Sequence, residues 1–325
     1  MAAFRVALPA WNFQRVSWAA AVGVLLALTV TTFSLPGGND LYLFYLPFAQ
    51  GCVSCGYVPY FAQWPLTPLA FLPAGAEWPV YVLASALIWL GLAWVDRANP
   101  AVLLLSLPFL GELWLGQIDW VLAIGLVVAL RARNPYIRGL GIALMAVKPQ
   151  LAWLIILALL WRDREWWRVL TVPAAVGILS LLIFGPTWPL DWLRASSGLP
   201  VHIWRIASID IWPLGAALVW LPWLARERRA RVELAALVGC IATPFVGIYA
   251  YVLPLLIARP PWWALPLSYA WLLAYPWFGA DAIRFAWLLP LGLLIARLPQ
   301  LRSAVRAGWT GRDRPAPVDR TDHEQ

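Results

Sequence analysis

Charged residues are scarce in this sequence, and their scarcity excludes a soluble globular protein. They make up 12% of the 325 residues, whereas apolar residues make up 62%, and the mean hydropathy is +0.72. So little polar surface cannot cover a water-soluble globule. Apolar runs such as 18–30, 78–95 and 169–184 recur along the chain, as expected for helices in a hydrocarbon core about 30 Å thick. We therefore expect an all-α polytopic membrane protein.

Cysteine is also rare, with three copies, which are too few for a disulfide framework or a metal cluster. Cys52 and Cys55 form a CxxC pair. This pair has three possible interpretations: a small extracytoplasmic disulfide, two free thiols or a redox motif. The first two are favoured, because no βαβ pattern surrounds it.

Basic residues occur in short clusters between the apolar segments. The formal net charge of +8 does not indicate a nucleic-acid partner, because no soluble fold lies behind these clusters. In membrane proteins such clusters collect in cytoplasmic loops, so they define the topology instead. The 24 Trp residues fit the aromatic belts at the headgroup level, where the partners are membrane lipids.

One arrangement of about ten to twelve transmembrane or half-membrane helices keeps nearly all basic residues on one side. It places both termini and the arginines of 162–168 and 226–231 in the cytoplasm. Segments of eleven residues rise only about 16 Å, so they are expected to pair as half-membrane hairpins beside an outward-open cavity. The segments are 17–34, 79–95, 101–116, 119–130, 137–147, 151–161, 168–185, 211–225, 232–246, 249–258, 262–278 and 281–297.

The rival topology treats 137–161 and 232–258 as single helices. It exports the arginines of the two clusters, which the positive-inside rule disfavours. The first topology leaves four basic residues outside or at membrane depth, and these become candidate functional cations. They are Lys148, Arg194, Arg205 and Arg284.

Two loops on the outside are long, 35–78 and 185–210, and long ordered loops usually carry function. In the first, 41–50 is expected to form a short amphipathic helix. Residues 1–297 are expected to form a single membrane domain. Residues 298–325 are expected to form a disordered cytoplasmic tail, whose end from residue 312 is polar and contains prolines.

A set of short motifs resembles glycosyltransferase family 87 over about residues 14–258. In chain order the motifs are Asp40, Tyr42, Tyr45, Gly56, Pro59-Tyr60, Trp64-Pro65-Leu66-Thr67-Pro68, Gly116-Gln117-Ile118-Asp119, Gly139, Gly141, Lys148-Pro149-Gln150, the Trp- and Arg-rich 161–168, Thr243-Pro244 and Tyr249. Two positions depart from the family pattern. Asp119 stands where the family usually has Asn, and no His or Asp lies near Tyr249 and Tyr251.

The resemblance implies a GT-C-type fold with a large first extracytoplasmic loop. It also implies an inverting transferase, similar to bacterial mannosyltransferases, in the plasma (inner) membrane. Such enzymes move a hexose from a polyprenyl-phosphate donor to a lipid or glycan acceptor on the extracytoplasmic face. No cofactor is implied, and dependence on a divalent metal stays open.

By this resemblance, Asp40 has the role of the catalytic base. A sugar on polyprenyl phosphate already has a good leaving group, so the main proton task is to deprotonate the acceptor hydroxyl, and one carboxylate suffices. The alternative role for Asp40 is structural. Gly37-Gly38-Asn39-Asp40 is a good helix entry, so the side chain can instead cap the helix that starts at Leu41.

Glu112, Gln117 and Asp119 lie at the outer end of one segment and the following turn. They are candidates to bind a sugar or acceptor, to orient Asp40 or to hold a metal. Helix capping and pairing with Lys148 are the structural alternatives. No ligand spacing specifies a metal site, so none is assigned. The other candidate sugar- or acceptor-binding residues are Tyr42, Tyr45, Gln150, His202 and Tyr249.

Lys148 lies between two apolar runs and precedes a proline. A buried ammonium at membrane depth costs several kcal/mol unless it meets water or an anion, which makes Lys148 a candidate for the donor phosphate. Snorkelling and a pair with Glu112 are the alternatives. Arg205, in the second long loop, is the other candidate phosphate ligand, whereas Arg194 and Arg284 suit lipid headgroups.

Two other classes of function stay open. A transporter should show repeated halves with paired broken helices, which this sequence lacks. A non-catalytic family member acting as a lipid-binding scaffold is compatible with the missing polar residue near Tyr249. Convergence of Asp40, Asp119 and Lys148 would favour the transferase, and their separation would favour the other two.

Overall fold

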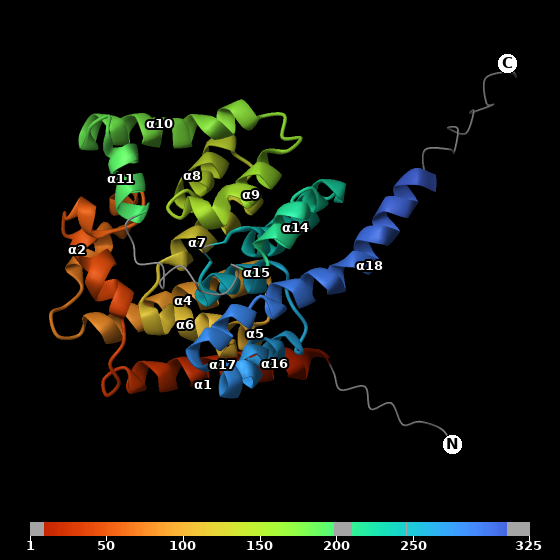
Figure 1. The fold of residues 1–325 in the computed structure, drawn as a ribbon, viewed down its shortest axis with the longest axis horizontal. Helices are drawn as coiled ribbons and strands as arrows, with labels where there is room; N and C mark the ends of the chain where they lie inside the picture. Colours follow the sequence, from red (N-terminus) through yellow and green to blue (C-terminus); the bar gives the residue numbers. More distant parts are fainter. Residues whose placement is uncertain (1–9, 198–209, 245, 311–325) are drawn as a thin grey trace, which may run out of the picture.

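The computed structural model describes residues 10–197, 210–244 and 246–310. In those ranges the chain forms helices joined by turns and contains no strand. Figure 1 shows α1 and α10 at opposite edges of the molecule, with α7, α8 and α9 on the α10 side. The helices are α1 (Ala10–Thr31), α2 (Leu46–Ala49), α3 (Gln63–Leu66), α4 (Glu77–Asp96), α5 (Pro100–Leu105), α6 (Leu107–Leu115), α7 (Asp119–Arg131), α8 (Pro135–Met145), α9 (Pro149–Leu160), α10 (Trp166–Phe184), α11 (Trp188–Ser197), α13 (Trp212–Ala217), α14 (Arg228–Ala242), α15 (Val252–Ile257), α16 (Ala264–Ser268), α17 (Tyr275–Phe278) and α18 (Leu288–Thr310).

Two of these helices are long and apolar enough to cross a bilayer: α4 with 20 residues and α10 with 19. The stretches Ala270–Phe285 and Leu288–Pro299 meet at a bend of 57° and together have the length and composition of a third span. Other apolar helices, such as Pro149–Leu160, are shorter than a span. The composition and these helices indicate a membrane protein.

Local sequence sets several helix starts. Asn99, Ser106 and Asn134 each accept a hydrogen bond from a backbone N–H of the following turn, and a proline follows each of them in the first turn. Ser106 corrects one prediction, because it ends α5 and begins α6. The segment 101–116, predicted to be continuous, is therefore two helices.

The predicted segment 262–278 is also broken. It contains α16, a 3₁₀ turn at Ala270–Ala274 and α17, each only a few residues long. Pro266 and Pro276 lie in this region and cannot donate the backbone hydrogen bonds of a continuous helix. At the other end, α18 continues past residue 297, so the beginning of the predicted tail is helical. Residues 311–325 lie outside the described part of the chain.

Glycines let α7, α8 and α10 approach one another closely. A Cβ on Gly125 of α7 would lie 2.5 Å from the carbonyl oxygen of Gly141 in α8. A Cβ on Gly139 of α8 would lie 2.3 Å from the carbonyl oxygen of Val169 in α10. Thus α8 packs between α7 and α10, whereas α9 packs along α14. The two helices that flank Lys148 therefore have different neighbours.

The buried carboxylate of Asp96, at the end of α4, gathers arginines from three other helix ends. Arg229 at the start of α14 binds both of its oxygens, with Nη1–Oδ1 at 2.8 Å. Arg131 and Arg259 each approach it to 3.8 Å. These arginines were predicted to lie on one side of the membrane, and the structure brings them together at one cluster.

The two long loops pack on each other. The predicted helix at 41–50 is confirmed as a π-helical turn, Leu41–Tyr45, followed by α2, and Cys52 and Cys55 form a disulfide. The second loop holds α11, which we did not predict. The Tyr60 ring stacks on Trp188 at 5.5 Å, and Trp192 donates a 2.8 Å hydrogen bond to the carbonyl of Tyr57. The first loop is thereby fixed against α11.

Candidate functional site

The Gln117 side chain joins most of the predicted site residues. Its Nε2 donates a hydrogen bond to Asp40 Oδ2. Its Oε1 accepts two hydrogen bonds, at 2.6 Å from Lys148 Nζ and at 2.9 Å from the Tyr45 hydroxyl. Because both donors are on Oε1, the amide can only turn its N–H groups towards Asp40. The structure therefore brings Asp40, Tyr45 and Lys148 together around one amide.

Lys148 forms a buried ion pair with Asp119. Its side chain is 4% exposed and that of Asp119 is 1% exposed. Ion pairing was one of the structural alternatives for Lys148. Its partner is Asp119, not Glu112. Glu112 instead accepts a 2.9 Å hydrogen bond from the backbone N–H of Asp119. One oxygen of each carboxylate, Glu112 Oε2 and Asp119 Oδ2, has no hydrogen-bond partner in the described residues.

The turn between α6 and α7 builds this arrangement. Gly116 ends α6 with φ of 74°, and a Cβ there would lie 2.6 Å from Leu41 Cβ, so only glycine fits. Gly38, with φ of 75°, donates a 2.8 Å hydrogen bond to the carbonyl of Trp114. The Asp40 loop therefore docks directly on the turn that carries Gln117 and Asp119.

Asp40 does not cap a helix in this structure. It precedes the turn Leu41–Tyr45, but its side chain makes no capping hydrogen bond and binds Gln117 instead. Burial raises the pKa of the Asp40 carboxyl above its ordinary value, and the positive charge of Lys148 opposes that rise. The carboxylate is half-buried, a setting that suits a base.

Aromatic rings surround the ammonium group of Lys148. Its Nζ lies 5.0 Å from the centre of the Tyr249 ring and 5.9 Å from that of Tyr45, which are cation–π distances. Tyr81 donates a hydrogen bond to the backbone carbonyl of Gln117 and accepts one at 3.3 Å from Trp120 Nε1. Tyr81 and Trp120 were not predicted, since in the sequence they resemble any aromatic residue of an apolar helix.

The remaining predicted residues lie apart from this cluster or outside the described ranges. Tyr42 is 42% exposed, and Gln150 is exposed and contributes its carbonyl to Thr243 Oγ1 at 3.1 Å. His202 and Arg205 fall within 198–209, outside the described residues. Arg194 and Arg284 are exposed and pair with Asp191 and Asp210.

The side chains of the site do not form a recognisable set of metal ligands. Among the residues that the structure describes, no three His, Cys, Asp or Glu side chains gather closely enough to hold an ion. The acidic residues of the site are instead bound to a lysine, an amide and a backbone N–H. Whether the protein depends on a metal stays an open prediction.

A helical membrane protein that buries one ammonium group and several carboxylates is a candidate membrane enzyme, because such charges are costly to bury and usually mark a functional site. The model of glycosyltransferase family 87 matches residues 57–276, more than half of the chain. The chain belongs to glycosyltransferase family 87, as the resemblance predicted. The match begins after Asp40, Tyr42, Tyr45 and Gly56 and extends beyond residue 258, the predicted end of the resemblance. Comparison with curated proteins and with solved structures found no match.

Proposed function

We propose that this protein is an inverting glycosyltransferase of the plasma membrane. It moves a mannose-like hexose from a polyprenyl-phosphate donor to a lipid or glycan acceptor on the extracytoplasmic face. Membership of the family supports sugar transfer. The observation that carries the rest is the contact of Asp40 and Lys148 with the same Gln117 amide, because it joins a candidate base to a candidate phosphate ligand.

In the proposed reaction, Asp40 takes the proton of the acceptor hydroxyl. That oxygen attacks the anomeric carbon from the side opposite the phosphate, and the bond from this carbon to the phosphate oxygen breaks. The electron pair leaves with the polyprenyl phosphate, which gives inversion in one step. Gln117 holds Asp40 Oδ2, so Oδ1 is the oxygen that takes the proton.

Lys148 is the proposed partner of the donor phosphate. An ammonium group has three N–H donors, and two of them bind Gln117 and Asp119. The third is assigned to a phosphate oxygen, where a charge-assisted hydrogen bond stabilises the leaving group. Tyr45 and Tyr249 flank the ammonium and are proposed to contact the sugar ring.

The test is transfer of labelled sugar by purified protein from a panel of polyprenyl-phosphate sugars to extracted membrane lipids. We expect at least one donor to yield a labelled product with inverted anomeric configuration. Absence of transfer from every donor, with a correctly folded protein, would contradict the proposal. It would favour the scaffold or transporter function instead.

The positioning of Asp40 is tested at Gln117. We expect Gln117→Leu to lower turnover by about 10- to 100-fold, because losing the one hydrogen bond that positions the Asp40 carboxylate costs about 1.5–3 kcal/mol. Loss of the Gln117 amide should also shift the acid limb of the pH–rate profile, a readout that simple loss of packing would not move. Phe71→Leu, at an exposed position of the same long loop, is the control and should keep normal turnover.

The proposed topology has both termini and the 162–168 cluster in the cytoplasm. We expect a cysteine placed at Arg164 to resist an impermeant thiol reagent added outside intact cells. A cysteine at the exposed Ala74, in the first long loop, should be labelled. The native free thiol, Cys240, is buried and gives a low background. Labelling at position 164 from outside would reject this topology.

A further inference from the structure

Two aromatic side chains at the start of α4 contact the two segments that form the Asp40–Gln117 hydrogen bond. Trp78 and Tyr81 are three residues apart, so they lie on the same face of the helix. Their rings are nearly parallel, with centres 6.3 Å apart and an angle of 14° between the planes, and both side chains are buried. The two residues therefore form one aromatic support beside the site.

Tyr81 holds the backbone of Gln117. Its hydroxyl donates a hydrogen bond to the Gln117 carbonyl and accepts one at 3.3 Å from Trp120 Nε1, which fixes the direction of its single O–H. Gln117 lies in the turn between α6 and α7, outside both helices, so a side chain has to restrain this carbonyl. The amide of Gln117 extends from the same restrained backbone, and Tyr81 thereby limits where that amide can lie.

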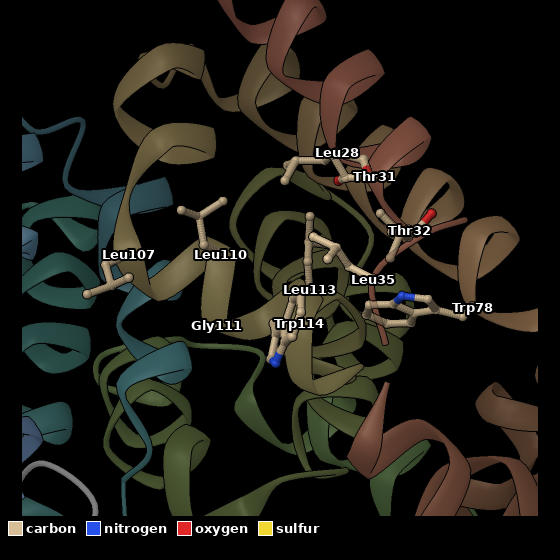
Figure 2. A pocket seen from close by; sticks show the side chains of 11 residues that line it. Leu28, Thr31, Thr32, Leu35, Trp78, Leu107, Leu110, Gly111, Leu113 and Trp114 are labelled. Atoms are coloured by element: carbon tan, nitrogen blue, oxygen red, sulfur yellow. The ribbon is translucent and has the colours of Figure 1, made fainter. Parts of the chain in front are cut away.

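Trp78 supports the start of the Asp40 loop. A Cβ on Gly37 would lie 2.4 Å from its ring, and a Cβ on Gly38 would lie 2.8 Å from it, so the loop backbone rests directly on the indole. The ring also borders an apolar cavity of about 400 Å³ between α1, α4 and α6 (Figure 2), together with Thr32 and Leu35. Beside this open space, the loop depends on the Trp78 ring for its packing.

The helix that carries this pair is itself firmly held. α4 has 20 residues and is long enough to span a bilayer. Its last residue, Asp96, binds Arg229 of α14 through both carboxylate oxygens, and α4 also packs against α7, which begins at Asp119. Side chains on a rigid helix hold their positions more precisely than side chains on a loop. α4 can therefore serve as the common reference for the Asp40 loop and the Gln117 turn.

Building on the transferase reaction proposed above, we infer that Trp78 and Tyr81 are positioning residues that hold the Asp40 loop and the Gln117 turn in one fixed alignment. Trp78 sets where the loop enters the site. Tyr81 sets where the Gln117 amide lies, so that its N–H meets Asp40 Oδ2. Neither residue is assigned a contact with the substrates, and both act through the Asp40–Gln117 hydrogen bond.

The first test removes the Tyr81 hydroxyl and keeps its ring. An N–H donor favours the charged form of a carboxyl group, so Tyr81→Phe, by loosening Gln117, should raise the pKa of the Asp40 carboxyl. Infrared difference titration of the purified protein, with Asp40→Asn as the blank, measures this without donor or acceptor. Tyr269→Phe is the matched control. It removes another tyrosine hydroxyl that donates to a backbone carbonyl, that of Leu105 at 2.5 Å, and should leave the titration unchanged.

Transfer assays give the second test. Tyr81→Phe and Trp78→Leu should each lower kcat by about 3- to 10-fold, the factor expected for one neutral hydrogen bond. In a Gln117→Leu protein the same two changes should lower kcat less than about twofold, because the hydrogen bond through which they act is already lost. Trp94→Leu, at an exposed position of the same helix, is the control and should have no effect on kcat in either protein.

Two outcomes would overturn the inference. One is an Asp40 carboxyl that titrates in Tyr81→Phe as it does in the wild type. The other is a loss of kcat in Tyr81→Phe and Trp78→Leu that is as large in the Gln117→Leu protein as in the wild type, because the two residues would then only stabilise the fold. The infrared titration needs no turnover, so absence of transfer from every donor with the titration shift intact would overturn only the proposed function.

Discussion

Asp40→Asn is expected to remove most sugar transfer while donor binding persists. The amide has nearly the size of the carboxylate and can still contact Gln117, but it cannot take the acceptor proton. General-base catalysis contributes about 10²–10⁴-fold, so kcat should fall by a factor in that range. Donor affinity, measured separately with a non-transferable polyprenyl phosphate, should stay close to that of the wild type.

The pH dependence gives this prediction a second readout. Burial raises the pKa of Asp40 above its ordinary value, against the opposing charge of Lys148. The base works only when deprotonated, so turnover is present above that raised pKa and is lost as the pH falls through it. Asp40→Asn should abolish this acid limb, whereas Phe71→Leu, at an exposed position of the first long loop, should retain it.

Near-normal transfer by Asp40→Asn would reject Asp40 as the base. The next candidates would be Asp119 and Glu112, whose free oxygens, Oδ2 and Oε2, lie buried in the same site. Glu112→Gln and Asp119→Asn would then be compared in the same assay. Loss of the acid limb in one of them would identify the base.

The sequence predicted the long apolar helices best, because length and hydropathy alone define them. The predicted segment 79–95 corresponds to α4 and 168–185 to α10, each within a few residues. The break at Ser106 was missed because the residues around it are apolar on both sides. Its signal is local: a serine N-cap with a proline two residues later.

The site could be predicted in part. Asp40, Gln117 and Lys148 came from the family motifs, and the structure brings them into contact. Which carboxylate pairs with Lys148 could not be read from spacing, since both Glu112 and Asp119 lie near the turn. The choice depends on the left-handed Gly116 and on the Asp119 backbone N–H, which holds Glu112. Tyr81 gave no sequence signal, because its contact with Gln117 spans 36 residues.

The Lys148–Asp119 pair permits a sharper experiment than removing the lysine alone. Removing one partner of a buried ion pair destabilises a protein by about 3–5 kcal/mol, because the other charge is left uncompensated. Lys148→Ala would therefore mix lost phosphate binding with lost stability. Lys148→Met together with Asp119→Asn removes both charges, and Asn is also the residue that the family usually has at position 119.

The double variant Lys148→Met/Asp119→Asn is expected to fold and to bind a polyprenyl phosphate donor about 10- to 100-fold more weakly, as for loss of one charge-assisted hydrogen bond. Asp119→Asn alone is the matched control. It leaves the Lys148 ammonium without its carboxylate, so this variant is expected to be less stable than the wild type, but the donor affinity of its folded fraction should be kept or increased. If the double variant bound the donor as tightly as Asp119→Asn does, Lys148 would serve only the fold, and the phosphate ligand would have to be another cation of the outer loops, with Arg205 the next residue to substitute.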